Sequence, residues 1–115
     1  MKNTLNILLI GLCLLMFIIP NAAFSEPKLA WNTSSGQVDG YRIYYGTTQG
    51  NYSNNKDVGN VTEYSLVALP LQERNTYYFI ARAYNNAGES GDSNWVSWKV
   101  PDTTAPAPVQ SVDIN

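Results

Sequence analysis

Apolar and polar positions alternate with a period of two along much of the chain after residue 25. Side chains of a strand point alternately to opposite faces, whereas an amphipathic helix repeats every three to four residues. Clusters of Gly, Asn and Pro separate the alternating runs and indicate turns. The pattern therefore predicts an all-β fold of short antiparallel strands, with a further short edge strand near Tyr52. The predicted strands are 28–31, 41–45, 61–67, 76–84 and 94–100.

A different pattern occupies the start of the chain. An uncharged apolar run extends over 13 residues, 7–19, and is shorter than the roughly 20 residues of a membrane-spanning helix. Pro20 ends the run, and Ala23 and Ser25 are small residues at the two positions that a signal peptidase inspects. We predict a cleaved secretory signal over residues 1–25, a secreted, periplasmic or cell-surface location, and no membrane attachment after cleavage. The alternative is an uncleaved apolar anchor.

Composition removes most catalytic chemistry. The chain has no His, and its single Cys, Cys13, lies in the predicted signal, so the mature chain has neither residue type. Ser–His, Cys–His and common zinc sites are thereby excluded, and we expect no enzyme, metal or cofactor. The oxygen-rich segment 89–94 lacks the spacing of an EF-hand loop. The net charge of −2 and pI near 4.8 disfavour nucleic-acid binding. The remaining carboxylates are interpreted as solvated surface groups rather than a glycosidase pair: Asp39, Asp57, Glu63, Glu73, Glu89 and Asp92.

The order and spacing of four motifs resemble the fibronectin type III family over roughly residues 29–100. Leu29-Ala30-Trp31 is similar to the strand that carries the family's buried tryptophan, and 40–46 (GYRIYYG) to a central strand. Leu69-Pro70 followed by 77–85 is similar to the corner and the long strand after it, and 86–90 to the next loop. The resemblance implies an immunoglobulin-like, seven-stranded sandwich of two sheets, which is used mostly as a spacer or binding module.

The chain departs from the family pattern at both ends. We expect the domain to occupy residues 26–100 with its first strand short or missing, because Trp31 follows so soon after the predicted signal. Residues 101–115 are a Pro- and Thr-rich linker or C-terminal tail, in which 109–114 alternates like the opening strand of a following domain. One interpretation is a fragment of a longer surface protein. The other is self-association, in which this tail supplies the missing edge strand of a neighbouring molecule.

Alternation also assigns the buried face of each strand. Tyr77 is expected to be the tyrosine-corner residue that the resemblance implies, with its hydroxyl bonded to backbone near residues 69–71. Burial of each large apolar side chain contributes about 1.5–3 kcal/mol. Besides Tyr77, the predicted core is Trp31, Ile43, Tyr45, Leu66, Phe79, Ala81, Val96 and Trp98.

The opposite face of the same strands is a candidate binding surface. Family topology places 41–45, 76–84 and 94–100 side by side, so their outward aromatic residues and arginines would gather there, together with Ile80. These residue types are enriched at protein interfaces, although cross-strand aromatic pairs also stabilise solvated sheets. We expect a non-catalytic module that binds an unidentified protein or glycan, or else an accessory domain of a secreted polysaccharide-acting enzyme. The candidate residues are Arg42, Tyr44, Tyr78, Arg82, Tyr84 and Trp95.

Overall fold

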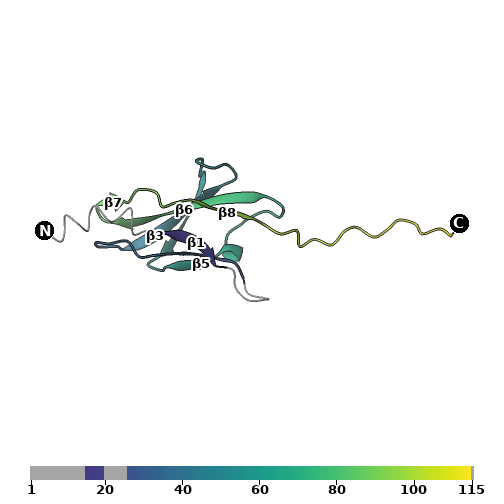
Figure 1. Cartoon of the computed structure of the whole chain (residues 1–115), viewed down its shortest axis with the longest axis horizontal. Helices are drawn as coiled ribbons and strands as arrows, with labels where there is room; N and C mark the ends of the chain where they lie inside the picture. The colour runs from purple at the N-terminus through teal and green to yellow at the C-terminus, as the bar shows by residue number, and fades with distance from the viewer. Residues whose placement is uncertain (1–14, 20–25, 115) are drawn as a thin grey trace.

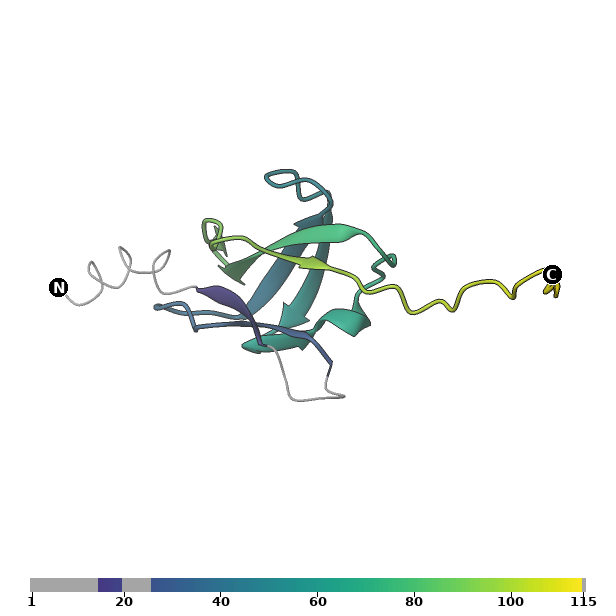
Figure 2. The same ribbon diagram turned by 45° about the vertical axis from the view of Figure 1, so that its right-hand side comes forward.

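The computed structural model describes residues 15–19 and 26–114, which fold into two antiparallel sheets packed face to face (Figure 1 and Figure 2). The all-β sandwich predicted from the alternation is confirmed. The smaller sheet contains β1 (Met16–Ile19), β2 (Lys28–Trp31) and β5 (Glu63–Ser65). The larger sheet contains β3 (Gly40–Gly46), β4 (Asn54–Gly59), β6 (Thr76–Asn85), β7 (Gly88–Glu89) and β8 (Val96–Lys99).

Strand pairing places the two longest strands, β3 and β6, at the centre of the larger sheet. In the larger sheet β3 lies between β4 and β6, and the two ends of β6 pair with β7 and β8. The register sets Ile43 opposite Ala81 and Tyr45 opposite Phe79. Side chains in directly opposed positions lie on the same face. The apolar residues of both strands therefore face the smaller sheet.

The core lies between the sheets, where the two layers meet. Trp31 packs against Tyr41 with ring centroids 5.6 Å apart, and Tyr45 stacks on Phe79 at 6.0 Å. Of the predicted core, seven residues are buried, namely Trp31, Ile43, Tyr45, Leu66, Tyr77, Phe79 and Ala81. Val96 and Trp98 are only partly buried and pack against this cluster, because β8 is an edge strand that, among the described strands, pairs with β6 alone.

The first strand, expected to be short or missing, is present and short. β1 pairs with β2 at the edge of the smaller sheet, and Met16 is only 2% exposed within the core. Its residues belong to the segment predicted as a secretory signal. Cys13 and the predicted cleavage site at 23–25 lie outside the described residues, so the signal stays a prediction.

Three segments differ from the predicted strand bounds. The run at 61–67 divides into β5 and a 3-10 turn, η1 (Leu66–Ala68), which points Leu66 fully into the core. The edge strand begins at Asn54 rather than near Tyr52, and Asn51 before it pairs back with Thr48 across a turn that contains Gly50 at φ +85°. β8 begins at Val96, two residues later than predicted, since the side chains before it bond to neighbouring strands.

The corner before β6 is fixed by Tyr77. Its ring is buried, and its hydroxyl oxygen accepts the backbone N–H of Gln72 at 3.0 Å. The bonded residue, Gln72, lies one position beyond the predicted stretch 69–71. It closes the corner by satisfying a backbone donor that no strand partner reaches.

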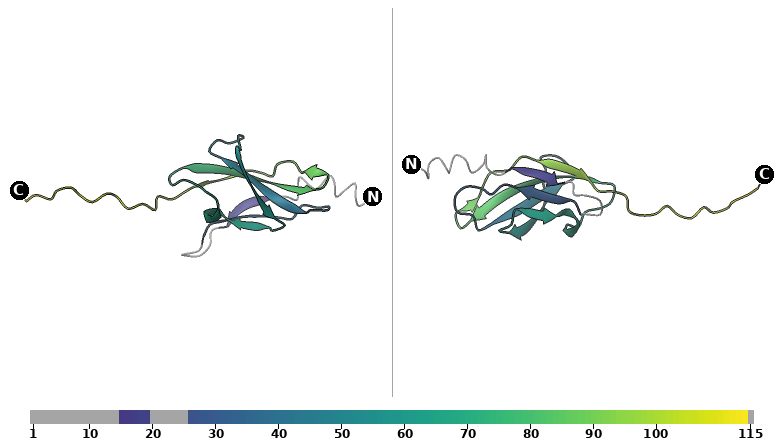
Figure 3. Two further views of the ribbon diagram at one scale, coloured as in Figure 1. Left: turned by 180° about the vertical axis from the view of Figure 1, so that it is seen from behind. Right: turned by 60° about the horizontal axis from the view of Figure 1, so that its bottom comes forward.

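The C-terminal tail leaves the sandwich as an extended, exposed segment (Figure 3). Its start is held at Glu73, whose carboxylate accepts the backbone N–H of Thr103 at 2.7 Å and the hydroxyls of Thr103 and Thr104. These hydrogen bonds, first that from the Thr103 hydroxyl, lower the pKa of Glu73 to about 2. Within the described residues, no helix is long and apolar enough to cross a membrane.

Candidate functional site

Two arginines lie opposite each other on the outer face of the larger sheet. Arg42 of β3 and Arg82 of β6 are direct cross-strand partners, and like charges in that position repel. Glu89 of β7 lies between them: its carboxylate is 3.2 Å from Arg42 Nε and accepts a hydrogen bond from Arg82 Nη1, also at 3.2 Å. Asp57 lies 3.7 Å from Arg42, and Asp92 lies 2.6 Å from Arg82. Three carboxylates therefore neutralise the two guanidinium groups.

Two tyrosines complete this charged cluster. The Arg82 guanidinium lies over the Tyr44 ring at 4.5 Å, and Arg42 lies over the Tyr84 ring at 5.7 Å. The Tyr44 hydroxyl donates to Glu89 at 2.7 Å, and the Tyr84 hydroxyl donates to Asp57 at 2.9 Å. We call these seven residues the arginine network: Arg42, Tyr44, Asp57, Arg82, Tyr84, Glu89 and Asp92. Within it, both cations and both hydroxyls have partners.

The pKa shifts in the arginine network follow from these bonds. The Tyr44 hydroxyl and then Arg82 lower the pKa of Glu89, although partial burial opposes them. Burial and then the bond to Glu89 raise the pKa of Tyr44. The Gly59 backbone N–H and then Tyr84 lower the pKa of Asp57, and the bond to Asp57 raises the pKa of Tyr84. The carboxylates therefore stay charged and the phenols neutral near pH 7, so neither tyrosine is tuned as a base.

The remaining aromatic residues of the candidate surface form a separate pair. Tyr78 and Trp95 meet edge to face with ring centroids 5.5 Å apart. Trp95 is 45% exposed, and it is the only exposed aromatic side chain among residues 26–114. It lies just before β8, outside the strand to which it was assigned.

Ile80 was expected on the outward surface, and this prediction is wrong. Its side chain is 2% exposed, although its position in β6 is on the outer face. Tyr44 is its cross-strand partner, and Tyr78 and Arg82 flank it two positions away on the same face. Because these larger side chains surround it, Ile80 is covered. The surface is thus divided into the arginine network and the Tyr78–Trp95 pair.

Sequence reasoning missed the carboxylates of the arginine network. Asp57, Glu89 and Asp92 were interpreted as solvated surface groups, yet each pairs with an arginine. Two arginines at opposed positions of neighbouring strands were the available signal, because such a pair requires nearby negative charge. Which carboxylates supply it depends on β4, on β7 and on the loop after β7.

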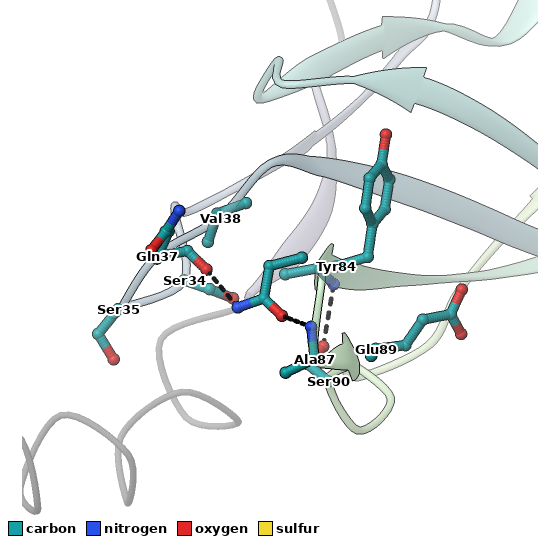
Figure 4. Close-up of a pocket in the computed structure, with 11 residues that line it drawn as sticks. Ser34, Ser35, Gln37, Val38, Tyr84, Ala87, Glu89 and Ser90 are labelled. Atoms are coloured by element: carbon teal, nitrogen blue, oxygen red, sulfur yellow. Dashed lines mark hydrogen bonds between the residues drawn. The ribbon is translucent and has the colours of Figure 1, made fainter.

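A small polar notch lies at one end of the sandwich, between segments 34–38 and 83–90, and measures about 180 Å³ (Figure 4). Asn85 spans it, donating to the Gln37 carbonyl at 2.9 Å and accepting the Ala87 backbone N–H at 2.8 Å. The Ser34 hydroxyl on its wall is buried and has no partner. Over residues 15–19 and 26–114, no group of three His, Cys, Asp or Glu side chains is placed to hold a metal. The notch offers neither paired carboxylates nor an activated nucleophile.

Comparison with known proteins agrees with this architecture. The model of the family described as "Fibronectin type III domain" matches residues 21–99. A curated relative is the Kelch domain-containing protein SSO1033 of Saccharolobus solfataricus, 34% identical over 95 residues. That match covers 83% of this chain but only 12% of the relative, so the chain spans a small part of that protein's length.

Solved structures show the same fold at low identity. A fibronectin type III domain of human KIAA0970 protein superposes with a TM-score of 0.63 at 14% identity, covering 99% of this chain and 92% of that one. The third fibronectin III domain of human KIAA0343 protein gives a TM-score of 0.58 at 21% identity, covering 81% and 85%. At these identities the likeness establishes the fold.

Proposed function

Because the chain belongs to the fibronectin type III family, whose members are typically non-catalytic binding or spacer modules, we propose that this domain binds a partner protein through the Tyr78–Trp95 pair. The observation that carries the proposal is the exposure of Trp95 beside a partly buried tyrosine. Tryptophan and tyrosine dominate binding energy at protein interfaces when they are held rigidly and desolvated by the partner. The edge-to-face contact with Tyr78 holds the indole in that way.

The arginine network supports this assignment by acting as a frame. Its guanidinium groups are engaged by carboxylates of the same chain, so they do not offer free cations to a ligand. Charged groups that surround an aromatic anchor are typical of the polar rim of an interface. We therefore separate the roles within the candidate surface: Trp95 and Tyr78 make the contact, and Arg42 and Arg82 hold the sheet face around them.

The setting of the proposed interaction is outside the cytoplasm. The predicted secretory signal at 1–25 supports it. The match to a small part of a much longer relative supports a second role as a module beside other domains. An accessory role in a polysaccharide-acting enzyme would place a glycan, rather than a protein, on Trp95.

The test compares the wild-type domain with Trp95→Ala. Each protein is immobilised, exposed to surface proteins of the source cells and to a glycan array, and the bound material is quantified. Val67→Ala is the matched control, because Val67 is also an exposed apolar side chain but lies in η1, on the connection between the sheets. The proposal predicts proteins that are enriched by the wild type and the control and lost with Trp95→Ala. Equal enrichment by all three proteins would indicate that the domain acts as a spacer. Loss of the glycan signal alone would favour the enzyme-accessory role.

A further inference from the structure

The edge of the smaller sheet is built to receive an extended segment. β1 lies in it through pairing with β2, with Met16 opposite Trp31 and Ile18 opposite Leu29. The side chains of Met16 and Ile18 point to the core, where Met16 is buried, while Phe17 between them is 43% exposed. The edge therefore accepts two apolar side chains at positions i and i+2 and leaves the residue between them in solvent.

Asn94 holds the backbone of the segment in this edge. Its side chain accepts the Met16 N–H at 2.8 Å and donates to the Met16 carbonyl at 2.9 Å. The preceding residue is fixed to β6, because Ser93 Oγ accepts the Ala81 N–H at 2.8 Å and Ser93 N–H donates to the Ala81 carbonyl at 3.1 Å. Since Asn94 contacts only main-chain atoms of Met16, the clamp does not select a particular side chain.

The occupant of this edge comes from the segment predicted to be removed on export. Cleavage near residue 25 would take β1 away and leave the β2 edge unpaired, together with the space that Met16 fills in the core. An unpaired sheet edge with an apolar groove is a template for another strand. The inference takes this predicted cleavage as its starting condition and is independent of the surface around Trp95.

The tail of the same chain has the matching pattern. Val109, Val112 and Ile114 are 77%, 86% and 100% exposed, so their apolar surface lies in water. In an extended segment Val112 and Ile114 share one face, and Asp113 between them lies on the other. Placed like β1, these two side chains take the positions of Met16 and Ile18, and Asp113 takes the solvent position of Phe17.

We propose that after cleavage residues 110–114 of a second copy occupy the place of β1, linking mature chains head to tail. The direction in which the tail leaves the sandwich favours the tail of a second copy, rather than the chain's own tail, as the occupant of the edge. The tail leaves the sandwich at the end toward which β1 runs (Figure 1 and Figure 2), so the chain's own tail would have to double back along the sheet before pairing antiparallel with β2. A neighbouring copy can enter directly. Such head-to-tail contacts use two different surfaces and build chains of molecules.

The experiment uses the chain of residues 1–115, which includes the predicted leader. It is expressed for export in a bacterial host and purified, its N-terminus is read by intact mass, and its association is followed by sedimentation velocity over a range of concentrations. The test variant is Val112→Lys/Ile114→Lys. The control is Val109→Lys, which adds one positive charge, half that of the test variant, at an exposed valine on the opposite face of the tail. A synthetic peptide of residues 14–20 serves as a competitor for the edge.

The proposal predicts a mature N-terminus near Glu26 and association that increases with concentration. The double variant should raise the midpoint concentration of association about tenfold or more, since two aliphatic side chains lose their burial. Val109→Lys should leave it unchanged, and the peptide should dissociate the assemblies. Mature protein that retains Met16, that stays monomeric at all concentrations, or that associates regardless of the double variant and the peptide would overturn the proposal. So would cleaved protein that is unfolded and is not rescued by a peptide of residues 105–115.

Discussion

Glu89 is the residue on which the arginine network depends most, and Glu89→Gln tests this directly. Its carboxylate accepts hydrogen bonds from the Tyr44 hydroxyl at 2.7 Å and from Arg82 Nη1 at 3.2 Å, and it lies 3.2 Å from Arg42 Nε. The substitution keeps the size of the side chain but leaves Arg42 and Arg82 facing each other across the strands with less neutralising charge.

The size of the stability loss expected for Glu89→Gln depends on how exposed the interacting side chains are. Hydrogen bonds to a charged group contribute about 1.5–3 kcal/mol when shielded, and exposed ion pairs about 0.2–1 kcal/mol. The side chains of Glu89, Arg42 and Arg82 are 30–33% exposed, which is intermediate. We therefore expect Glu89→Gln to lower the free energy of unfolding by about 2 kcal/mol, and Tm by about 10 °C for a domain of this size. Denaturant unfolding followed by tryptophan fluorescence measures the change.

The control is Glu63→Gln, which removes an isolated surface pair. Lys28 Nζ lies 3.1 Å from Glu63 Oε1, and the Glu63 side chain is 53% exposed, so the expected loss is below about 0.5 kcal/mol. The two proteins should also differ in pH response. Because the folded-state pKa of Glu89 lies below its ordinary value of 4.5, its contribution is complete above that pH and disappears as pH falls through the folded-state pKa. If Glu89→Gln were no more destabilising than Glu63→Gln at pH 7, the reasoning would be refuted.

Three further predictions follow from single contacts. Gly46→Ala should destabilise the fold by about 1–3 kcal/mol in denaturant unfolding, because a Cβ there would lie 2.5 Å from the Asn51 backbone oxygen. The control Gly91→Ala should be near neutral, because a Cβ there has no atom within 4 Å. Equal losses of stability in the two variants would contradict this prediction. Tyr77→Phe should cost about 1 kcal/mol, because the Gln72 N–H loses its acceptor; an unchanged Tm would count against the corner. The Thr103 amide signal in NMR should shift as pH falls from 4.5 toward 2, because protonation of Glu73 releases the start of the tail. The same shift in the Glu73→Gln variant would show that Glu73 is not its cause.

The sequence predicted those parts of the fold in which local pattern and burial agree. Strict alternation in β3 and β6 placed Ile43, Tyr45 and Phe79 in the core, and the tyrosine corner was displaced by only one residue. Ile80 lies on the predicted outer face but is buried, because alternation reports the face of a strand and not the size of the side chains around it. β1 was missed because an apolar run before a predicted cleavage site has the same composition as a buried edge strand.

The candidate surface was predicted less completely than the fold. The residue types and the shared face of Arg42, Tyr44, Arg82 and Tyr84 followed from strand alternation. The division into two parts did not, because it depends on Glu89 and Asp92, which reach the arginines only after β7 pairs with β6 and the next loop folds along that strand. Such contacts are set by tertiary structure and leave no local pattern.

The central claim is that Arg42 and Arg82 are held by carboxylates of their own chain, which leaves the Tyr78–Trp95 pair as the proposed contact surface. The most direct test of the ion pairs is to record the side-chain Nε–Hε signals of the three arginines in a nitrogen–proton NMR spectrum. Arg74 serves as the internal reference, because it takes part in none of the ion pairs found among residues 15–19 and 26–114. We predict that the Arg42 and Arg82 signals are dispersed and exchange with water more slowly than that of Arg74. Three overlapping signals with equally fast exchange would contradict the account.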